Sequence, residues 1–250
     1  MSNRRTKRIL NEIKEIKESE EILSKNGIYV IFDEHDISDV YALLVGPEGT
    51  PYEKGFYFFK FTYPNEYPMI PPIANFCTQG SLNYKNIIRS NIRFNPNLYT
   101  CGKVCLSMLN TWSGPGWVPT NTMSNVLIAI QALVFNSDPL KNEPGFENSN
   151  GDIIEKYSEL IRYANIRIGV FQMVHNPPFY FFKDKLIELY NEYKEYYIDF
   201  IKKKNIEYNN QIFNIEVGVY DLRCTINYKN LMDEIELFDD AEEELKNRIK

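Results

Sequence analysis

The chain has 250 residues, 44% of them hydrophobic and 14% aromatic, which suffices for one large domain or for one domain with an extension. Its formal net charge of -6 argues against a protein that binds nucleic acid through a basic surface, because Lys and Arg supply most phosphate affinity. No apolar run approaches the roughly 20 residues that cross a bilayer, and no apolar signal core follows the basic N-terminus. We therefore expect a soluble, cytoplasmic protein with no membrane partner. The nucleus is a second candidate compartment.

The first half of the chain predicts one helix followed by a small sheet. Ile9, Ile13 and Ile16 recur at helical spacing among charged residues, which predicts an amphipathic helix over residues 4–24. Short runs rich in aromatic and β-branched residues predict four strands, at residues 28–32, 40–45, 55–61 and 73–77. Their close succession predicts an antiparallel meander sheet, and the mixture of helices and strands predicts an α+β fold.

The segment from Tyr67 to Pro72 predicts a rigid surface loop. Its prolines cannot donate hydrogen bonds to a sheet, so it is not a central strand. Tyr67–Pro68 is a candidate cis peptide bond, a form that occurs mainly before proline. Met69 lies among these prolines, which favours an exposed side chain over the alternative of a gap-filling core residue.

The second half of the chain predicts further helices. Thr122 is a candidate N-cap for a helix with a single apolar stripe. A second helix is predicted from Asp152 to about Met173, and a long aromatic-rich helix over residues 179–204.

The last part of the chain changes in character. Residues 212–219 predict a strand, and residues 233–250 form an acidic, helix-like pattern. No Gly/Ser-rich linker separates this part from the rest. We therefore predict one core domain over residues 1–204 and a C-terminal extension over residues 205–250 that packs on it.

The chemistry of the chain centres on the turn-rich segment from Asn95 to Leu106. Cys105 supplies a thiol, and Asn97 stands upstream with a side-chain amide. A thiol that attacks a thioester needs a donor for the oxyanion that forms, and an amide can be that donor. Pro96 stiffens the turn that aims Asn97. The alternative is a buried structural cysteine after an ordinary turn.

Cys101 precedes Cys105 at a spacing that raises the question of zinc. A tetrahedral site needs further ligands. The chain has only two histidines, His35 and His175, and no second cysteine pair close in sequence. We expect no metal site, and four dispersed cysteines do not form a disulfide-scaffold pattern.

Several motifs carry a resemblance to a known family. They are Tyr67-Pro68-Met69-Ile70-Pro71-Pro72, Phe94-Asn95-Pro96-Asn97, Gly102-Lys103-Val104-Cys105-Leu106, Thr111-Trp112-Ser113-Gly114-Pro115 and Asn142-Glu143-Pro144-Gly145-Phe146-Glu147. In this order and at these distances they resemble ubiquitin-conjugating enzymes, in which a His-Pro-Asn motif precedes the catalytic cysteine. The stretches that begin at Phe94, Thr111 and Asn142 are similar to the Z-type subclass of that family.

The resemblance implies the ubiquitin-conjugating (UBC) fold and acyl transfer through a cysteine thioester. Cys105 would accept ubiquitin or a ubiquitin-like modifier from an activating enzyme in an ATP-dependent pathway. A lysine of a substrate protein, or a cysteine of a ubiquitin ligase, would then receive it. Asn97 would stabilise the oxyanion or organise the loop. The reaction implies no cofactor and no nucleic acid.

The resemblance also assigns surfaces for partners. The basic residues of the first helix dock the activating enzyme in this family, which makes candidates of Arg4, Arg5, Lys7 and Arg8; a solvated helix face is the alternative. Met69 occupies the place of an apolar residue offered to the ligase. Pro119 and Thr120 occupy a second loop that faces the ligase.

Two positions depart from the common family pattern. The family histidine is Asn95 here, as in the Z-type motif, and we expect Asn95 to keep a hydrogen-bonding role. Many members place an acidic residue across the site to help the incoming lysine. Counting along the chain puts Lys141 there, and a small gap would put Asn142 or Glu143 there. We choose Glu143, with a solvated loop charge as the alternative.

Three other functions remain open. A cysteine hydrolase would need a base paired with the thiol, and neither histidine has a flanking motif. A catalytically inactive UBC-fold scaffold would bind ubiquitin or a ligase without carrying the modifier, but such variants typically lack the cysteine. A plain interaction domain of related fold would not need Asn97 and Cys105 in register.

Overall fold

The computed structural model describes residues 3–79 and 92–235. Its helices are α1 (Asn3–Glu18), α2 (Glu20–Lys25), α3 (Met123–Ala129), α4 (Asp152–Ala164), α5 (Met173–His175) and α6 (Lys183–Glu207). Its strands are β1 (Ile28–Phe32), β2 (Asp39–Val45), β3 (Phe56–Thr62), β4 (Ile73–Phe76), β5 (Phe213–Val217) and β6 (Leu222–Ile226). Short 3-10 and π segments are η1 (Ser107–Leu109), η2 (Ile130–Val134), η3 (Pro139–Asn142), η4 (Asn165–Gln172), η5 (Tyr180–Phe182) and η6 (Val219–Asp221). Most of the acidic tail predicted as a helix lies outside the described residues.

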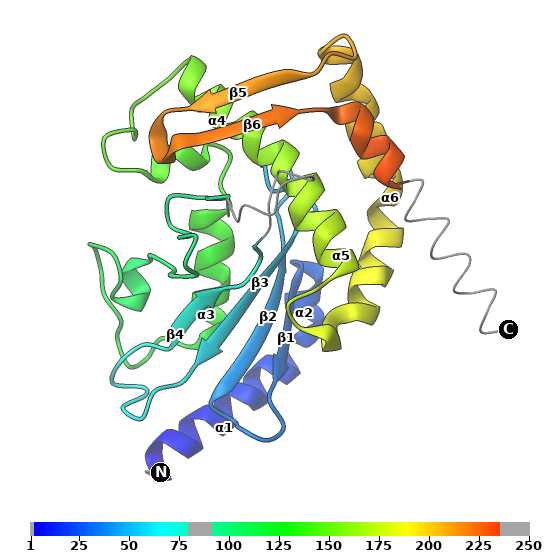
Figure 1. Ribbon diagram of the computed structural model, residues 1–250. Coiled ribbons are helices and arrows are strands. Elements are labelled where there is room, and N and C mark those ends of the chain that lie inside the picture. Colours follow the sequence, from blue (N-terminus) through cyan, green and yellow to red (C-terminus); the bar gives the residue numbers. More distant parts are fainter. Residues whose placement is uncertain (1–2, 80–91, 236–250) are drawn as a thin grey trace, which may run out of the picture.

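The first four strands form an antiparallel sheet in the order β1-β2-β3-β4, which confirms the predicted meander (Figure 1). Alternate side chains of β3 point to opposite faces, as in any strand. Tyr57 and Phe59 contact Phe135, which follows α3, whereas Phe58 contacts Phe179 and Phe182, which precede α6. Both faces of the sheet are therefore covered, and β3 is almost entirely buried.

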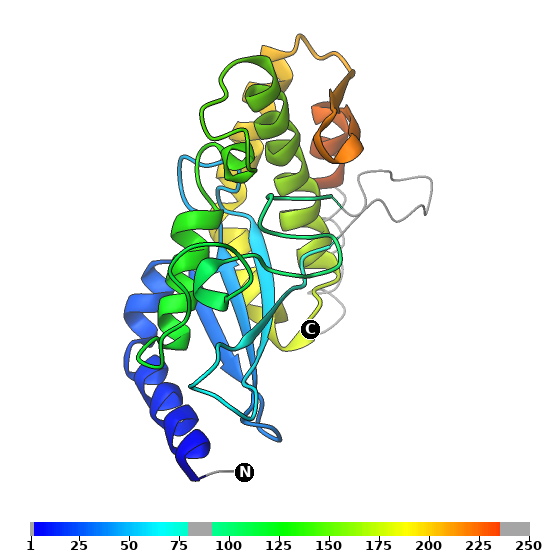
Figure 2. The ribbon, with the colours of Figure 1, turned by 90° about the vertical axis from the view of Figure 1, so that its left-hand side faces the viewer.

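The helices lie on both sides of this sheet, and Figure 2 shows α1, α2 and α3 on one side of it. The predicted first helix is interrupted at Ser19, where α1 gives way to α2. Thr122 is the N-cap of α3, as predicted: its hydroxyl accepts from the backbone N–H of Asn125, whose side chain in turn accepts from the Thr122 N–H. The predicted helix from Asp152 is α4, which continues through η4 and α5 to His175.

The proline-rich loop lies at the end of the sheet. The Tyr67–Pro68 peptide bond is cis, as predicted. The carbonyl of Pro68 accepts a hydrogen bond from Trp117 Nε1 at 2.8 Å, which ties this loop to the segment before α3. The side chain of Met69 is 58% exposed, which confirms the prediction that it faces solvent.

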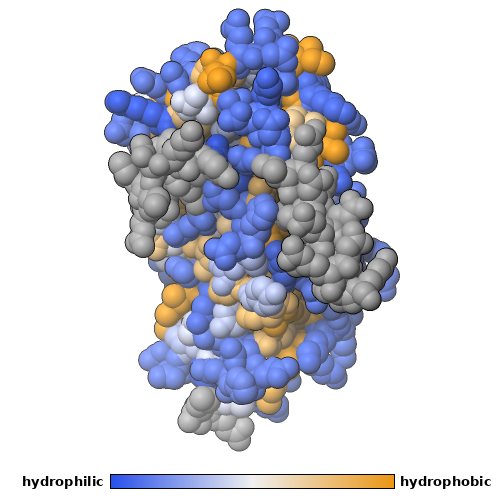
Figure 3. Space-filling model, turned by 45° about the vertical axis from the view of Figure 1, so that its right-hand side comes forward, coloured by the Kyte–Doolittle hydropathy of each residue, from blue (hydrophilic) through white to orange (hydrophobic). Residues whose placement is uncertain are grey.

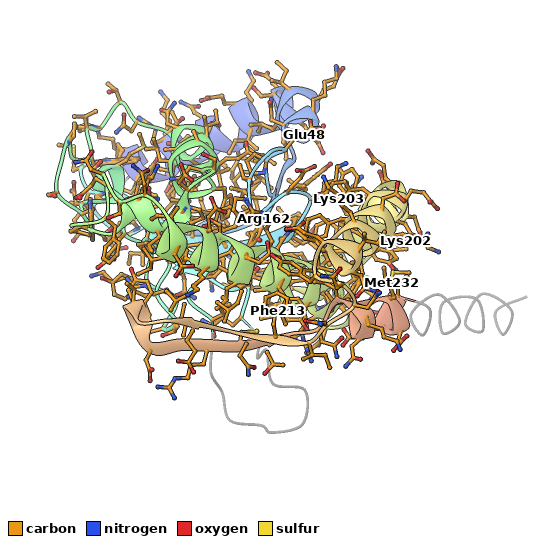
Figure 4. The ribbon with its side chains drawn as sticks, turned by 90° about the horizontal axis from the view of Figure 1, so that it is seen from above. Glu48, Arg162, Lys202, Lys203, Phe213 and Met232 are labelled. Atoms are coloured by element: carbon orange, nitrogen blue, oxygen red, sulfur yellow. The ribbon has the colours of Figure 1, made fainter. Side chains whose placement is uncertain are left out.

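The chain after α6 forms an antiparallel hairpin of β5 and β6, followed by helical turns at residues 228–235. The pattern had predicted the first strand and missed the second. Ile215, Val217, Cys224 and Ile226 are buried and belong to the same apolar core as the sheet. Figure 4 shows the hairpin alongside α4, with Phe213 and Met232 toward the end nearest α6. The domain boundary at residue 204 stays a prediction.

On the face drawn in Figure 3, most of the coloured side chains are hydrophilic. Figure 3 shows hydrophobic side chains in separate patches on the face that it presents. Among the described residues, no helix is both long enough and apolar enough to span a bilayer.

Candidate active site

The loop that carries Cys105 is folded back on the segment around Asn97. The backbone N–H of Cys105 donates to the Asn97 carbonyl at 2.8 Å, and an isolated β-bridge joins Leu98 to Val104. The turn between these two short stretches contains Gly102, whose φ of 92° lies in the left-handed region. A Cβ at Gly102 would meet the side-chain oxygen of Asn75 at 2.3 Å, so this turn requires glycine.

Asn97 points its amide at the residue that carries the thiol. Its Nδ2 donates to the backbone carbonyl of Cys105 at 2.7 Å. The side chain is 8% exposed, and its Oδ1 is a buried atom without a hydrogen-bond partner. This hydrogen bond ties Asn97 to the cysteine loop, and its part in stabilising an oxyanion stays a prediction.

Asn95 keeps a hydrogen-bonding role, as expected from the family histidine that it replaces. It is fully buried, and its Nδ2 donates to the Tyr52 hydroxyl at 2.9 Å and to the Val134 carbonyl at 2.7 Å. Its Oδ1 accepts from the backbone N–H of Asn97 at 2.8 Å and from Asn142 Nδ2 at 3.3 Å. Asn95 therefore joins the active-site loop to the end of η2 and to η3.

The Cys105 thiol is shielded from solvent, with 1% of the residue exposed, whereas Cys101 is exposed. A thiol so enclosed has to be uncovered before it can attack a thioester on another protein. Within the part of the chain that the structure describes, Cys105 has no hydrogen bond to a histidine. The thiol–base pair that a cysteine hydrolase needs is thus not formed there.

The other cysteines are expected to differ sharply in reactivity. Burial raises the pKa of Cys224 to about 12, because the thiolate cannot be solvated there. Near pH 8 only about one Cys224 in 10⁴ is then ionised, so a maleimide should label Cys101 first and Cys224 only after unfolding. Peptide mapping over time tests this order. Early labelling of Cys224 in the folded protein would contradict the packing of the hairpin on the core.

Glu143 caps the end of η3, and its carboxylate has a partner from the C-terminal extension. The Tyr220 hydroxyl, at the β5–β6 turn, donates to Glu143 Oε2. Figure 1 shows this turn beside the green loop that precedes α4. Glu143 is half-buried rather than a freely solvated loop charge. No sequence signal had linked the two residues, which are 77 positions apart.

The basic residues of α1 do not share one environment. Arg4 and Lys7 are exposed, and their contact with an activating enzyme stays a prediction. Arg5 is 3% exposed, and its guanidinium donates to Ser38 Oγ at 2.7 Å and to the carbonyls of Tyr63 and Pro64. We therefore withdraw Arg5 as a partner-binding residue, because its donors are used inside the fold.

Arg8 also acts mainly within the molecule. Its guanidinium donates to the backbone carbonyls of Pro119 at 2.8 Å and Asn121 at 2.5 Å. Pro119 and Thr120 are themselves exposed, close to the start of α3. Arg8 thus stabilises the second predicted ligase-facing loop through its backbone. The contacts of that loop and of Met69 with a ligase stay predictions.

Glu12 joins these elements and was missed by the sequence analysis. Its side chain is buried, and it accepts from Arg8 Nε at 2.6 Å, from the backbone N–H of Met123 at 2.9 Å and from the hydroxyls of Tyr63 and Tyr67. One carboxylate therefore holds α1, the proline-rich loop and the N-terminus of α3 together. An isolated glutamate in a charged helix gives no signal of this role.

No metal cluster is formed by the described residues, in which no three His, Cys, Asp or Glu side chains are grouped to hold an ion.

The chain was compared with known proteins. A family model described as ubiquitin-conjugating enzyme matches residues 8–168. The chain is 45% identical over 150 residues to ubiquitin-conjugating enzyme E2 Z of Xenopus tropicalis, covering 59% of this chain and 45% of that protein. It is 38% identical over 185 residues to the probable ubiquitin-conjugating enzyme protein 17 of Caenorhabditis elegans, covering 71% of this chain and 24% of that protein. It thus spans less than half the length of these relatives.

Among solved structures, the E2 domain of a Toxoplasma gondii ubiquitin conjugating enzyme matches with a TM-score of 0.46 and 24% identity, covering 66% of this chain and 98% of that one. The resemblance to the Z-type subclass is confirmed by the sequence relatives. Because the family model matches more than half of its residues, the chain belongs to the ubiquitin-conjugating enzyme family.

Proposed function

We propose that the protein carries ubiquitin or a ubiquitin-like modifier as a thioester on Cys105 and passes it to a lysine or to a ligase cysteine. One observation carries the proposal: the Asn97 amide is bonded to the Cys105 carbonyl within the stretch that matches the family model. This function requires three partners: an ATP-dependent activating enzyme, a ligase and a substrate protein. We place it in the cytoplasm, with the nucleus as a second candidate compartment.

The first step exchanges one thioester for another. The Cys105 thiolate attacks the modifier's C-terminal carbonyl carbon, a new C–S bond forms, and the activating enzyme's sulfur leaves as a thiolate. In the second step an amine nitrogen attacks, the C–N bond forms, and Cys105 leaves. Because the acyl group arrives activated, the site has to supply positioning and oxyanion stabilisation rather than a hydrolytic triad. Glu143 is proposed to take up the proton of the amine.

A loading assay tests this function. The protein is mixed with an activating enzyme, ATP and ubiquitin, and is run on gels with and without a reducing agent. We expect an adduct that the reducing agent removes. If no adduct forms with several activating enzymes and modifiers, the second candidate holds: an inactive UBC-fold scaffold, which the 1% exposure of Cys105 favours.

Asn97→Ala is expected to slow transfer from the loaded enzyme to free lysine by about 10²-fold, the usual cost of losing an oxyanion donor. The Cys105 carbonyl also loses its donor, so thermal unfolding is measured alongside. Asn97→Asp keeps the shape without the N–H donor and should be similarly slow. Asn148→Ala, at an exposed loop position, is the control. If both Asn97 variants discharge at the wild-type rate, Asn97 only shapes the turn and takes no part in transfer.

A further inference from the structure

The β5–β6 turn brings an aromatic side chain of the C-terminal extension to the active-site loop. Besides its hydrogen bond to Glu143, Tyr220 makes a cation–π contact with Arg93. The Arg93 guanidinium carbon lies 4.1 Å from the centre of the Tyr220 ring. The same guanidinium lies 3.9 Å from the ring centre of Tyr99, in the active-site loop. Arg93 thus contacts one ring from the extension and one from the loop that precedes Cys105.

Arg93 also contacts the backbone of the active site. Its Nη2 donates to the Pro96 carbonyl at 2.6 Å, and Pro96 is the neighbour of Asn97. Its own carbonyl accepts from the hydroxyl of Tyr157 in α4 at 2.7 Å. The Asn97 carbonyl in turn accepts from the Cys105 N–H. A continuous series of short contacts therefore runs from the extension to Cys105.

The turn holds Tyr220 in a rarely adopted backbone conformation. Tyr220 has φ 64° and ψ 13°, and Asp221 has φ 49°, both in the left-handed region that non-glycine residues seldom occupy. Such residues persist where surrounding contacts hold them, and they cluster at functional sites. Burial, and then the hydrogen bond to Glu143, raise the pKa of Tyr220. Its hydroxyl therefore stays a donor at neutral pH.

We propose that Tyr220 is a positioning residue for the transfer step, which makes the C-terminal hairpin part of the active site. Its hydroxyl orients the Glu143 carboxylate, and its ring holds Arg93 against the active-site loop. With Oε2 bound by the tyrosine, Oε1 is left to take the proton that the amine loses as the C–N bond forms and Cys105 leaves. This inference rests on the proposed function, because it gives Glu143 that role.

The test follows discharge of the loaded enzyme to free lysine, in a single turnover at one pH. Once loaded, Tyr220→Ala should discharge about tenfold more slowly than the wild type, a change of about 1.4 kcal/mol in the barrier. Tyr220→Phe keeps the ring on Arg93 and removes only the hydroxyl. It should discharge more slowly than the wild type and faster than Tyr220→Ala, because the ring still holds Arg93 while Glu143 loses its hydroxyl donor.

Two controls separate positioning from stability. Thr225→Ala alters an exposed side chain of the same hairpin and should match the wild type. In a Glu143→Gln background, Tyr220→Phe should have no further effect on discharge, because the group it orients has lost its function. Thermal unfolding of every variant shows whether the hairpin stays folded.

The outcomes are distinct. If the wild type loads and discharges, but Tyr220→Phe discharges at the wild-type rate, Tyr220 does not position Glu143. An equal loss from Tyr220→Phe in the wild-type and Glu143→Gln backgrounds would overturn the inference as well. If the wild type itself does not load, the proposed function fails, and this inference fails with it.

Discussion

Cys105→Ala is expected to form no thiol-sensitive adduct with ubiquitin, while Cys101→Ala loads as the wild type does. A thioester needs a sulfur nucleophile, and in the proposed function that sulfur is Cys105 rather than the exposed thiol of Cys101. We expect the rate of adduct formation to fall by at least about 10³-fold, to the level of the uncatalysed background. Gels run with and without a reducing agent measure the adduct directly.

Cys105→Ser sharpens this comparison. A serine hydroxyl is a weaker nucleophile, but its ester survives a reducing agent. An enzyme should therefore lose loading or trap a reductant-resistant adduct, whereas a scaffold would bind its partners unchanged. An adduct that persists in Cys105→Ala and disappears in Cys101→Ala would mean that the exposed cysteine is the nucleophile.

Glu12→Ala is expected to lower the free energy of unfolding by about 3 kcal/mol, the low end for removing one partner of a buried ion pair. The low end applies because Arg8, its partner, is 22% exposed and stays partly solvated. The buried hydroxyls of Tyr63 and Tyr67 and the N–H of Met123 would lose their acceptor at the same time. Urea unfolding curves give the change.

Glu15→Ala is the matched control, because Glu15 lies on the exposed face of the same helix. It should change stability by less than about 0.5 kcal/mol. Glu12→Gln keeps an acceptor without the charge and should fall between the two. Equal unfolding free energies for Glu12→Ala and Glu15→Ala would show that Glu12 does not hold α1 to the rest of the fold.

The elements of the core could be predicted because their patterns are local. Aromatic and β-branched runs marked the four strands within a residue or two, and Thr122 marked the start of α3. The break at Ser19 was missed because the apolar spacing of α1 continues into α2. The second strand of the hairpin was missed although Leu222, Cys224 and Ile226 alternate with polar residues, a pattern that did predict strands elsewhere.

The site was predictable only in part, because its remaining members are assembled by long-range contacts. The motif located Cys105, Asn97 and Asn95. It could not show that Arg5 turns inward, since a charged residue near the N-terminus usually faces solvent. Nor could it pair Tyr220 with Glu143, because no local pattern reports which distant side chains a fold brings together.

The most direct measurement identifies the cysteine that carries the modifier. After loading, free thiols are blocked under denaturing conditions, the thioester is released, and the freed thiol receives a second, distinguishable label. Trypsin separates the cysteines, because Cys101 falls in peptide 94–103 and Cys105 in peptide 104–141. We predict the second label on peptide 104–141 alone. A second label on peptide 94–103, or on neither peptide, would contradict a thioester on Cys105.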